Sequence, residues 1–384
     1  MAVLLMLPLL FGNFVLKETI PYGTSGPGGR ILCSDFNRNN LTDVIFTGYS
    51  GTYAIGMIFE RQDSGLYVLM DTVGFYLWIW DTGDLDVDGF YDLVTDGSDF
   101  IGLSVFESPD SFSYPTQEAW RDTVGPPLNL PISAFDLDRD NLPEIVKNIA
   151  TPFGDIGIYE SVGDNNYELV FADNPDTSGL EAPAATHAFG DFDGDDLIEC
   201  VFAGGNEWYW IYESPANNTY EKVDEGQLSM GNIRDCFAVP DADGDGKLEF
   251  VVKGFAILTG EIHAFIFEAI GDNTYEIIET FTLWGGDYYG GYSDVGDVDG
   301  DSIPEIALEG RQTVHIIKAA GNDSFYVWET LPGNASGSSV RVYDVDGNGL
   351  SEVIISGNNE TKIYEYQVGI EEDTGANISL GTLE

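Results

Sequence analysis

A nine-residue acidic motif occurs seven times in the 384-residue chain, and this repetition constrains the fold more than any other feature. The best-formed copy, residues 241–249, has acidic residues at positions 1, 3, 5 and 9 and glycine at position 6. The first positions of consecutive copies lie 47 to 56 residues apart. Self-similarity with a period of this length indicates a repeat architecture in which each unit is one supersecondary structure.

Each copy of the motif predicts a cation site. Carboxylates that converge in a tight turn repel one another unless a cation lies between them, and Ca²⁺ takes six to eight oxygen ligands. An EF-hand is excluded, because position 12 of the best copy is Val252 instead of glutamate and residues 248–253 form a β-type apolar run. The alternative is an acidic turn that is held by side-chain hydrogen bonds without a metal. Mg²⁺ fits less well, because it keeps most of its waters.

The seven motifs are numbered loops 1 to 7 in chain order, and their residues at positions 1, 3, 5 and 9 are the predicted metal ligands. Loops 1 to 4 supply Asp35, Asn37, Asn39, Asp43; Asp84, Asp86, Asp88, Asp92; Asp136, Asp138, Asp140, Glu144; and Asp191, Asp193, Asp195, Glu199. Loops 5 to 7 supply Asp241, Asp243, Asp245, Glu249; Asp297, Asp299, Asp301, Glu305; and Asp344, Asp346, Asn348, Glu352. Loop 1 has only two acids, so we expect it to bind Ca²⁺ most weakly or to stay empty. Position 6 is expected to have a positive φ.

The sequence around each loop also repeats. A short apolar strand precedes the loop, a second follows it, and a third ends in an aromatic–acid pair such as Phe59-Glu60. A turn of Gly, Asp and Asn then leads into a fourth strand. Such a four-stranded unit of about 50 residues has the size of a propeller blade. Seven blades must close into a ring, since an open array would expose edge strands.

The chain ends predict how the ring closes. Residues 13–19 match the fourth-strand pattern of residues 274–280, whereas residues 369–384 offer no good fourth strand. We therefore predict an all-β, seven-bladed β-propeller over residues 13–368, in which the N-terminal strand joins the last blade. Residues 369–384 are interpreted as a polar tail or linker. Residues 1–12 are interpreted as a remnant export signal, because their apolar run is too short to span a membrane.

The motif D-x-D-x-D-G-x-x-[D/E] between strands, repeated about the ring, resembles the FG-GAP/VCBS repeat of integrin α-subunit propellers and many bacterial surface proteins. The resemblance covers roughly residues 13–366. The Phe-Gly and Gly-Ala-Pro words of that family survive only in fragments, such as Phe189-Gly190 and residues 203–205. The resemblance implies that the calcium loops share one face of the ring, and that the loops on the opposite face bind ligands.

Aromatic residues on glycine-rich loops of that opposite face are the predicted ligand-binding residues, since such rings stack on sugars or on protein side chains. They are Trp284, Tyr288, Tyr289 and Tyr292, joined from neighbouring loops by Phe75, Tyr76, Phe153, Asn206, Trp208 and Arg311. The alternative is that these residues fill the central channel or cap the blades.

Composition excludes several functions. A formal net charge of −51 should repel nucleic acids and anionic membrane surfaces, and seven Ca²⁺ would offset only part of it. The three cysteines lie in apolar runs and are expected to be buried free thiols. The chain lacks the Gly-x-Ser-x-Gly, P-loop, dinucleotide and zinc-site patterns.

Together these features predict a monomeric, secreted or cell-surface propeller that is stabilised by up to seven Ca²⁺. Its expected function is non-catalytic binding or adhesion, with a carbohydrate or an extracellular protein as partner, and with neither nucleic-acid binding nor membrane insertion. Two alternatives remain at this stage. One is an enzyme, or its accessory module, that acts on polysaccharide, and the other is a structural spacer in a larger surface protein.

Overall fold

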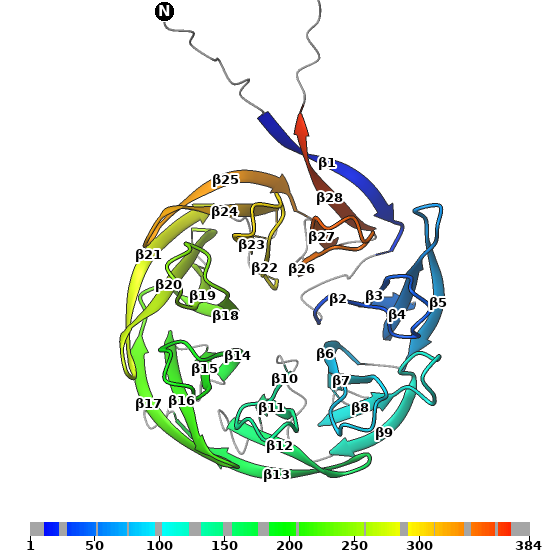
Figure 1. Ribbon diagram of the computed structural model, residues 1–384, viewed down its shortest axis with the longest axis horizontal. Helices are drawn as coiled ribbons and strands as arrows, with labels where there is room; N and C mark the ends of the chain where they lie inside the picture. The colour runs from blue at the N-terminus through cyan, green and yellow to red at the C-terminus, as the bar shows by residue number, and fades with distance from the viewer. Residues whose placement is uncertain are drawn as a thin grey trace, which may run out of the picture.

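The protein forms a ring of seven four-stranded antiparallel sheets around a central axis, as predicted (Figure 1). The computed structural model describes residues 11–22, 29–50, 53–74, 77–96, 102–122, 132–148, 156–175, 184–204, 207–256, 259–284, 291–310, 312–333, 339–357 and 360–369. Within these ranges the regular secondary structure consists of 28 β-strands and contains no helix. Accordingly, the described residues include no helix that could cross a membrane.

The strands follow one another from the centre of each blade to its rim. Blade 1 comprises β2 (Leu32–Ser34), β3 (Asp43–Ser50), β4 (Tyr53–Arg61) and β5 (Tyr67–Val73), and blade 2 comprises β6 (Ile79–Gly83), β7 (Asp92–Asp96), β8 (Leu103–Glu107) and β9 (Gln117–Asp122). Blade 3 comprises β10 (Ser133–Phe135), β11 (Glu144–Asn148), β12 (Ile156–Gly163) and β13 (Asn166–Asp173), and blade 4 comprises β14 (Ala184–Gly190), β15 (Glu199–Gly204), β16 (Trp208–Ala216) and β17 (Thr219–Gln227). Blade 5 comprises β18 (Asn232–Val239), β19 (Glu249–Ala256), β20 (Glu261–Gly271) and β21 (Thr274–Trp284), and blade 6 comprises β22 (Asp294–Gly296), β23 (Glu305–Glu309), β24 (Thr313–Gly321) and β25 (Ser324–Pro332). Blade 7 comprises β26 (Ser339–Tyr343), β27 (Glu352–Gly357) and β28 (Glu360–Gly369), and β1 (Phe11–Ile20) completes it.

The N-terminal strand closes the ring, which confirms the prediction from the chain ends. Strand β1 pairs with β28 in the sheet order β1-β28-β27-β26, so it is the outer strand of blade 7. The register places Phe11 opposite Gly369 and Ile20 opposite Thr361, with a bulge between Leu16 and Glu18. The closing strand comes from the other end of the chain, so neither end leaves an unpaired strand at the last blade.

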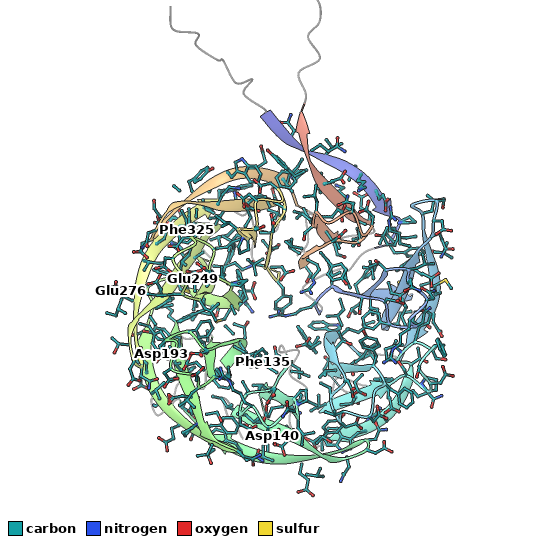
Figure 2. The ribbon with its side chains drawn as sticks, viewed as in Figure 1. Phe135, Asp140, Asp193, Glu249, Glu276 and Phe325 are labelled. Atoms are coloured by element: carbon teal, nitrogen blue, oxygen red, sulfur yellow. The ribbon has the colours of Figure 1, made fainter. Side chains whose placement is uncertain are left out.

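The hydrophobic core is divided among the interfaces between neighbouring blades. One cluster, for example, joins Phe192 and Val201 of blade 4 to Phe250 and Val252 of blade 5. Second strands such as β15 are buried along their whole length, which explains their continuous apolar runs, whereas outer strands such as β21 alternate with solvent-exposed residues. Figure 2 shows Phe135 of an inner strand near the centre and Glu276 of an outer strand at the rim.

Buried polar side chains fasten each blade to the next near the central axis. Asp81 accepts a hydrogen bond of 2.8 Å from the backbone N–H of Ala134 in the following blade. Asp235 of blade 5 accepts a hydrogen bond of 2.6 Å from the backbone N–H of Ser293, just before blade 6. The three cysteines are buried and free, as the sequence predicts.

Candidate metal centres

All seven acidic loops share one hydrogen-bonding framework. The position-9 carboxylate accepts the backbone N–H of position 2 at 2.6 to 3.0 Å in every loop. The position-2 side chain is apolar and buried, which anchors the loop start in the blade. The position-9 side chain is consequently at most 1% exposed in each loop, so a carboxyl group lies inside the protein.

The loop backbone requires two left-handed residues, and the sequence predicted only one of them. Position 6 has a positive φ in all seven loops, from 67° to 97°, as expected. Position 4 also has a positive φ, from 55° to 82°. Loops 4 to 7 place glycine at position 4, but loops 1 to 3 use Arg38, Val87 and Arg139. Val87 is β-branched and is therefore the most strained of these residues.

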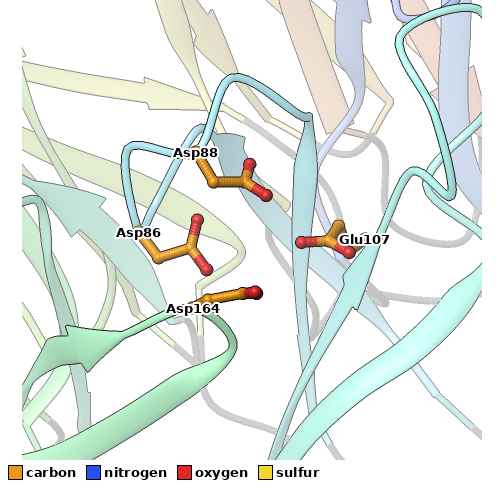
Figure 3. Close-up of side chains that lie close together, drawn as sticks. All are labelled: Asp86, Asp88, Glu107 and Asp164. Atoms are coloured by element: carbon orange, nitrogen blue, oxygen red, sulfur yellow. The ribbon is translucent and has the colours of Figure 1, made fainter.

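Two further groups of residues reach the loops, beyond the metal ligands that the sequence predicts. In every blade except blade 6, an acid in the second half of the third strand lies at the loop of its own blade. The hairpin between the third and fourth strands of the next blade closes the loop from the side. In loop 2, oxygens of Asp86, Asp88, Glu107 and Asp164 lie within 4.8 Å of one another (Figure 3). Glu107 ends β8, and Asp164 belongs to the β12–β13 hairpin of blade 3.

The hairpin contact recurs around the ring in loops 2 to 5. The backbone N–H groups of Asn165, Asn218, Asn273 and Asp323 donate to the position-3 aspartate of the preceding blade at 2.6 to 2.7 Å. All four donors have a φ between 50° and 54°, which Asn and Asp tolerate better than other non-glycine residues. The repeated Gly-Asp-Asn turns of the sequence were the available signal for this contact. Each of these centres therefore bridges two blades.

Buried oxygens without a hydrogen-bond partner among the described residues are concentrated in loops 2 to 5. The second oxygen of the position-9 acid is unpartnered in loops 2, 4 and 5, and in loop 3 it accepts only a 3.1 Å bond from Tyr220. Further unpartnered oxygens surround these sites, on Asp84, Asp86, Asp136, Asp241, Glu160, Glu268, Asn165, Asn218 and Asn273. Unpartnered buried oxygens are costly, and a cation with six to eight oxygen ligands would satisfy them.

The pKa values of the position-9 acids in loops 2 to 5 indicate that a positive charge would stabilise their ionised forms. Burial raises the pKa of Asp92, Glu144, Glu199 and Glu249, the position-2 N–H opposes this shift and neighbouring loop acids add to it, so that the pKa reaches about 8. Burial and like charges both disfavour the ionised form. A divalent cation at these positions would reverse this preference.

Loops 6 and 7 differ, because a lysine ammonium lies among their acids. Lys318 of β24 contacts Asp299, Asp301 and Glu305. Lys17 of β1 contacts Asp346 and Glu352, together with the third-strand acid Glu365. Burial lowers the pKa of both lysines, but these hydrogen bonds outweigh it and raise the pKa above its ordinary value. Both ammonium groups are therefore charged at neutral pH.

Loop 1 is satisfied by neutral donors. The side-chain amide of Asn37 donates to Glu60 at 3.2 Å, and Asn39 contacts the same carboxylate. The hydroxyl of Tyr114, from the β8–β9 connection of blade 2, lies 3.1 Å from Glu60 and 3.3 Å from Asp43. Both oxygens of Asp43 thus have partners, unlike those of the corresponding acids in loops 2, 4 and 5.

The predicted ligand face is described only in part. Trp284 ends β21 with 57% of its surface exposed, on the face opposite the acidic loops. Trp208 is half-buried and packs beside Trp210 in the core between blades 3 and 4. Tyr292 is buried against Trp80, with their ring centroids 5.6 Å apart, which fits the alternative that these aromatics fill the centre of the ring. The remaining predicted residues lie outside the described residues: Tyr288, Tyr289, Arg311, Phe75, Tyr76, Phe153 and Asn206.

A groove of about 280 Å³ lies on the acidic-loop face, between loops 4 and 5. Its walls include Asp191, Asp193 and Lys247, together with the apolar side chains of Leu248 and Ile270. This described groove is on the face opposite the predicted ligand residues.

Comparison with known protein families identifies part of the ring. Residues 191–252 match the family described as FG-GAP-like repeat. The matched segment runs from the first acid of loop 4 into β19 and so contains loops 4 and 5 complete. The match confirms the resemblance to FG-GAP-repeat propellers that the acidic motif indicated.

The fold is shared with a solved structure despite very low sequence identity. A chain in the crystal structure of BBS1N in complex with ARL6DN, soaked with lead, matches with a TM-score of 0.57 and 10% identity. The match covers 92% of the present chain and 96% of the other. A search of curated proteins gave no match. At this identity the similarity establishes the fold alone.

Proposed function

We propose that this protein is a calcium-stabilised extracellular binding propeller with Ca²⁺ in loops 2 to 5. The acids at positions 1, 3, 5 and 9 would hold each ion, assisted by the third-strand acids Glu107, Glu160, Glu213 and Glu268. The ion would supply the positive charge that buried carboxylates need, and it would join each loop to the hairpin of the next blade. Its role is structural, since the surrounding protein oxygens leave few positions for a substrate.

The hydrogen-bond partners of the position-9 acids are the main support for this proposal. These acids are buried to the same degree and accept the same backbone N–H in every loop. Their second oxygen is unpartnered in loops 2, 4 and 5, is contacted by a tyrosine in loops 1 and 3, and is contacted by a lysine in loops 6 and 7. Loops 2, 4 and 5 therefore lack an internal donor at this oxygen, and loop 3 retains unpartnered buried oxygens on Asp136, Glu160 and Asn218, so these four loops fit a metal ion.

A matched pair of substitutions tests the calcium sites. Glu249→Gln is expected to reduce the number of bound Ca²⁺ ions by one, because it removes one ligand charge at loop 5. Glu305→Gln changes the same position in loop 6 and is expected to leave the number unchanged. Equilibrium dialysis against radioactive Ca²⁺ measures both. Equal counts for Glu249→Gln and the wild type would reject Ca²⁺ in loop 5, and the absence of bound Ca²⁺ in the wild type would reject the whole assignment.

We further propose that the face carrying Trp284 binds a carbohydrate or a protein. Its exposed indole at the end of β21 offers a stacking surface on the face opposite the acidic loops. The BBS1N structure contains a complex with ARL6DN, which is consistent with a partner-binding role for this type of ring. In a glycan and protein array, Trp284→Ala is expected to weaken the strongest signal about tenfold or more, because stacking aromatics dominate such contacts. Phe112→Ala removes another exposed aromatic and serves as the control.

A further inference from the structure

Blade 6 breaks the pattern of third-strand acids that the other blades follow. The residue that follows the aromatic or apolar position is Glu60, Glu107, Glu160, Glu213, Glu268 and Glu365 in blades 1 to 5 and 7, but Lys318 in blade 6. Its ammonium Nζ lies 2.5 Å from Asp299, 2.8 Å from Asp301 and 2.8 Å from Glu305. The ring of Trp328 covers it, with the centroid 5.0 Å from Nζ. Three carboxylates and an aromatic face thus surround one positive charge.

Blade 7 reaches the same arrangement by a different route. Lys17 is the bulged residue of β1, at the position that Trp328 occupies in β25 of blade 6. Its Nζ lies 2.7 Å from Asp346, 3.0 Å from Glu352 and 2.8 Å from Glu365. The two lysines come from different strands, a third strand in one blade and a fourth strand in the other. Both nevertheless end at the position-3 and position-9 acids of their loops.

The contacts leave no role for a divalent ion in these loops. Each ammonium has three N–H donors, and each makes three hydrogen bonds to carboxylates. Both oxygens of Glu305 and of Glu352 are partnered, one by the lysine and one by a backbone N–H. A metal ion could enter only by displacing a like charge and breaking three charge-assisted hydrogen bonds.

We propose that Lys318 and Lys17 serve as built-in cations, so that loops 6 and 7 need no divalent metal and loop 6 becomes a Ca²⁺ site when Lys318 is replaced by glutamate. The inference rests on the proposed function and concerns loops 6 and 7, two of the three loops to which that function assigns no Ca²⁺. Lys17 lies on β1, the strand that closes the ring, so its ion pairs with loop 7 help to hold this strand in place. Loss of Ca²⁺ would then loosen loops 2 to 5 without releasing the closing strand.

The test compares Ca²⁺ binding and thermal unfolding of the wild type with those of Lys318→Glu. Lys318→Glu restores the acid of the other blades, so it is expected to bind one more Ca²⁺ than the wild type. It should melt lower than the wild type in chelator and recover when Ca²⁺ is added. Lys222→Glu makes the same charge change at an exposed lysine of blade 4 that pairs with Glu225, and it is expected to add no Ca²⁺.

The difference between variants separates this inference from the proposed function. One additional Ca²⁺ in Lys318→Glu supports the inference whether the wild type binds four ions or none, whereas a wild type that binds none overturns only the proposed function. An equal count in both proteins, or a wild type that binds more than five and so fills loop 6 or 7, overturns the inference. If Lys318→Glu does not fold, Lys318→Met in chelator is expected to melt roughly 5 to 10 °C below the wild type, because the buried Glu305 and the partly exposed Asp299 and Asp301 lose their cation. An unchanged melting temperature would then overturn it.

Discussion

A chain that lacks residues 1–25 is expected not to form a stable ring. The deletion removes β1, and with it the outer strand of blade 7 and the fully buried Ile20. Phe14 is lost from its contacts with Trp328 and Tyr366, whose ring centroids lie 5.6 and 5.4 Å away. Each buried apolar side chain contributes about 1.5–3 kcal/mol, and the removal of Lys17 leaves the buried Glu352 without its cation at further cost. Their sum is comparable with the lower end of the stability of a typical domain, about 5–15 kcal/mol.

A circular permutant provides the control for this deletion, because it keeps every residue and moves only the chain break. The permuted chain begins at residue 26, and residues 1–25 follow residue 384. The paired ends of β1 and β28, Phe11 and Gly369, are adjacent in the sheet, so residues 370–384 and 1–10 can connect them. We expect cooperative unfolding of the permutant, measured by circular dichroism, within a few degrees of the intact protein. Equal stability of the deletion variant and the intact protein would contradict closure by β1.

The ring was predictable from sequence because its determinants are local and repeated. Each blade contains its own turn residues and its own apolar runs, so the four-strand pattern could be identified in every unit. The closure was also predictable, because residues 13–19 carry a fourth-strand pattern without the other three strands beside them. The bulge that places Lys17 against loop 7 agrees with that alignment, in which Lys17 corresponds to Ile278.

The complete centres were less predictable, because they combine residues that are distant in sequence. Asn165 and Asp86 are 79 residues apart and meet only because consecutive blades lie side by side. The role of Glu107 depends on the register of β8 with β7, which places it opposite Asp92. The one exception to the third-strand acids, Lys318, was visible in the sequence. Its meaning depends on knowing that this strand position points into the acidic loop.

Exposure of the aromatic residues was the least predictable property. Trp284 and Tyr292 flank the same glycine-rich segment, yet one is exposed and the other is buried. Tyr292 packs against Trp80 of blade 2, and the guanidinium of Arg30 lies 5.5 Å from its ring centroid. Blade 6 and blade 2 are not neighbours in the ring, so this contact follows from the closed geometry and from no local pattern. It agrees with the alternative that some of these aromatics fill the centre.

Without divalent cations, the protein is expected to be more stable at pH 5 than at pH 8.5. Ca²⁺ is expected to abolish this decrease in stability at high pH. Burial raises the pKa of Asp92, Glu144, Glu199 and Glu249 to about 8 in the fold, whereas unfolded carboxyls titrate near 4. The folded state therefore binds more protons in this range, and the free energy of unfolding falls as pH rises from about 4 through about 8. Even about 1 kcal/mol from each of the four acids gives an effect of several kcal/mol. Melting temperatures across this range, with chelator and with Ca²⁺, measure it.

Glu249→Gln separates this proton linkage from the general repulsion of an acidic protein. Glutamine resembles the protonated acid and can still accept the N–H of Ala242, which Glu249 accepts at 2.9 Å. In chelator at pH 8.5 the variant is therefore expected to melt higher than the wild type, since it carries no buried charge at this position. With Ca²⁺ it is expected to melt lower, because a ligand charge is missing. General repulsion alone would raise stability under both conditions, so a change of sign between chelator and Ca²⁺ identifies Glu249 as a cation ligand. Stability that rises with pH in chelator would instead show that these acids are ionised in the metal-free fold.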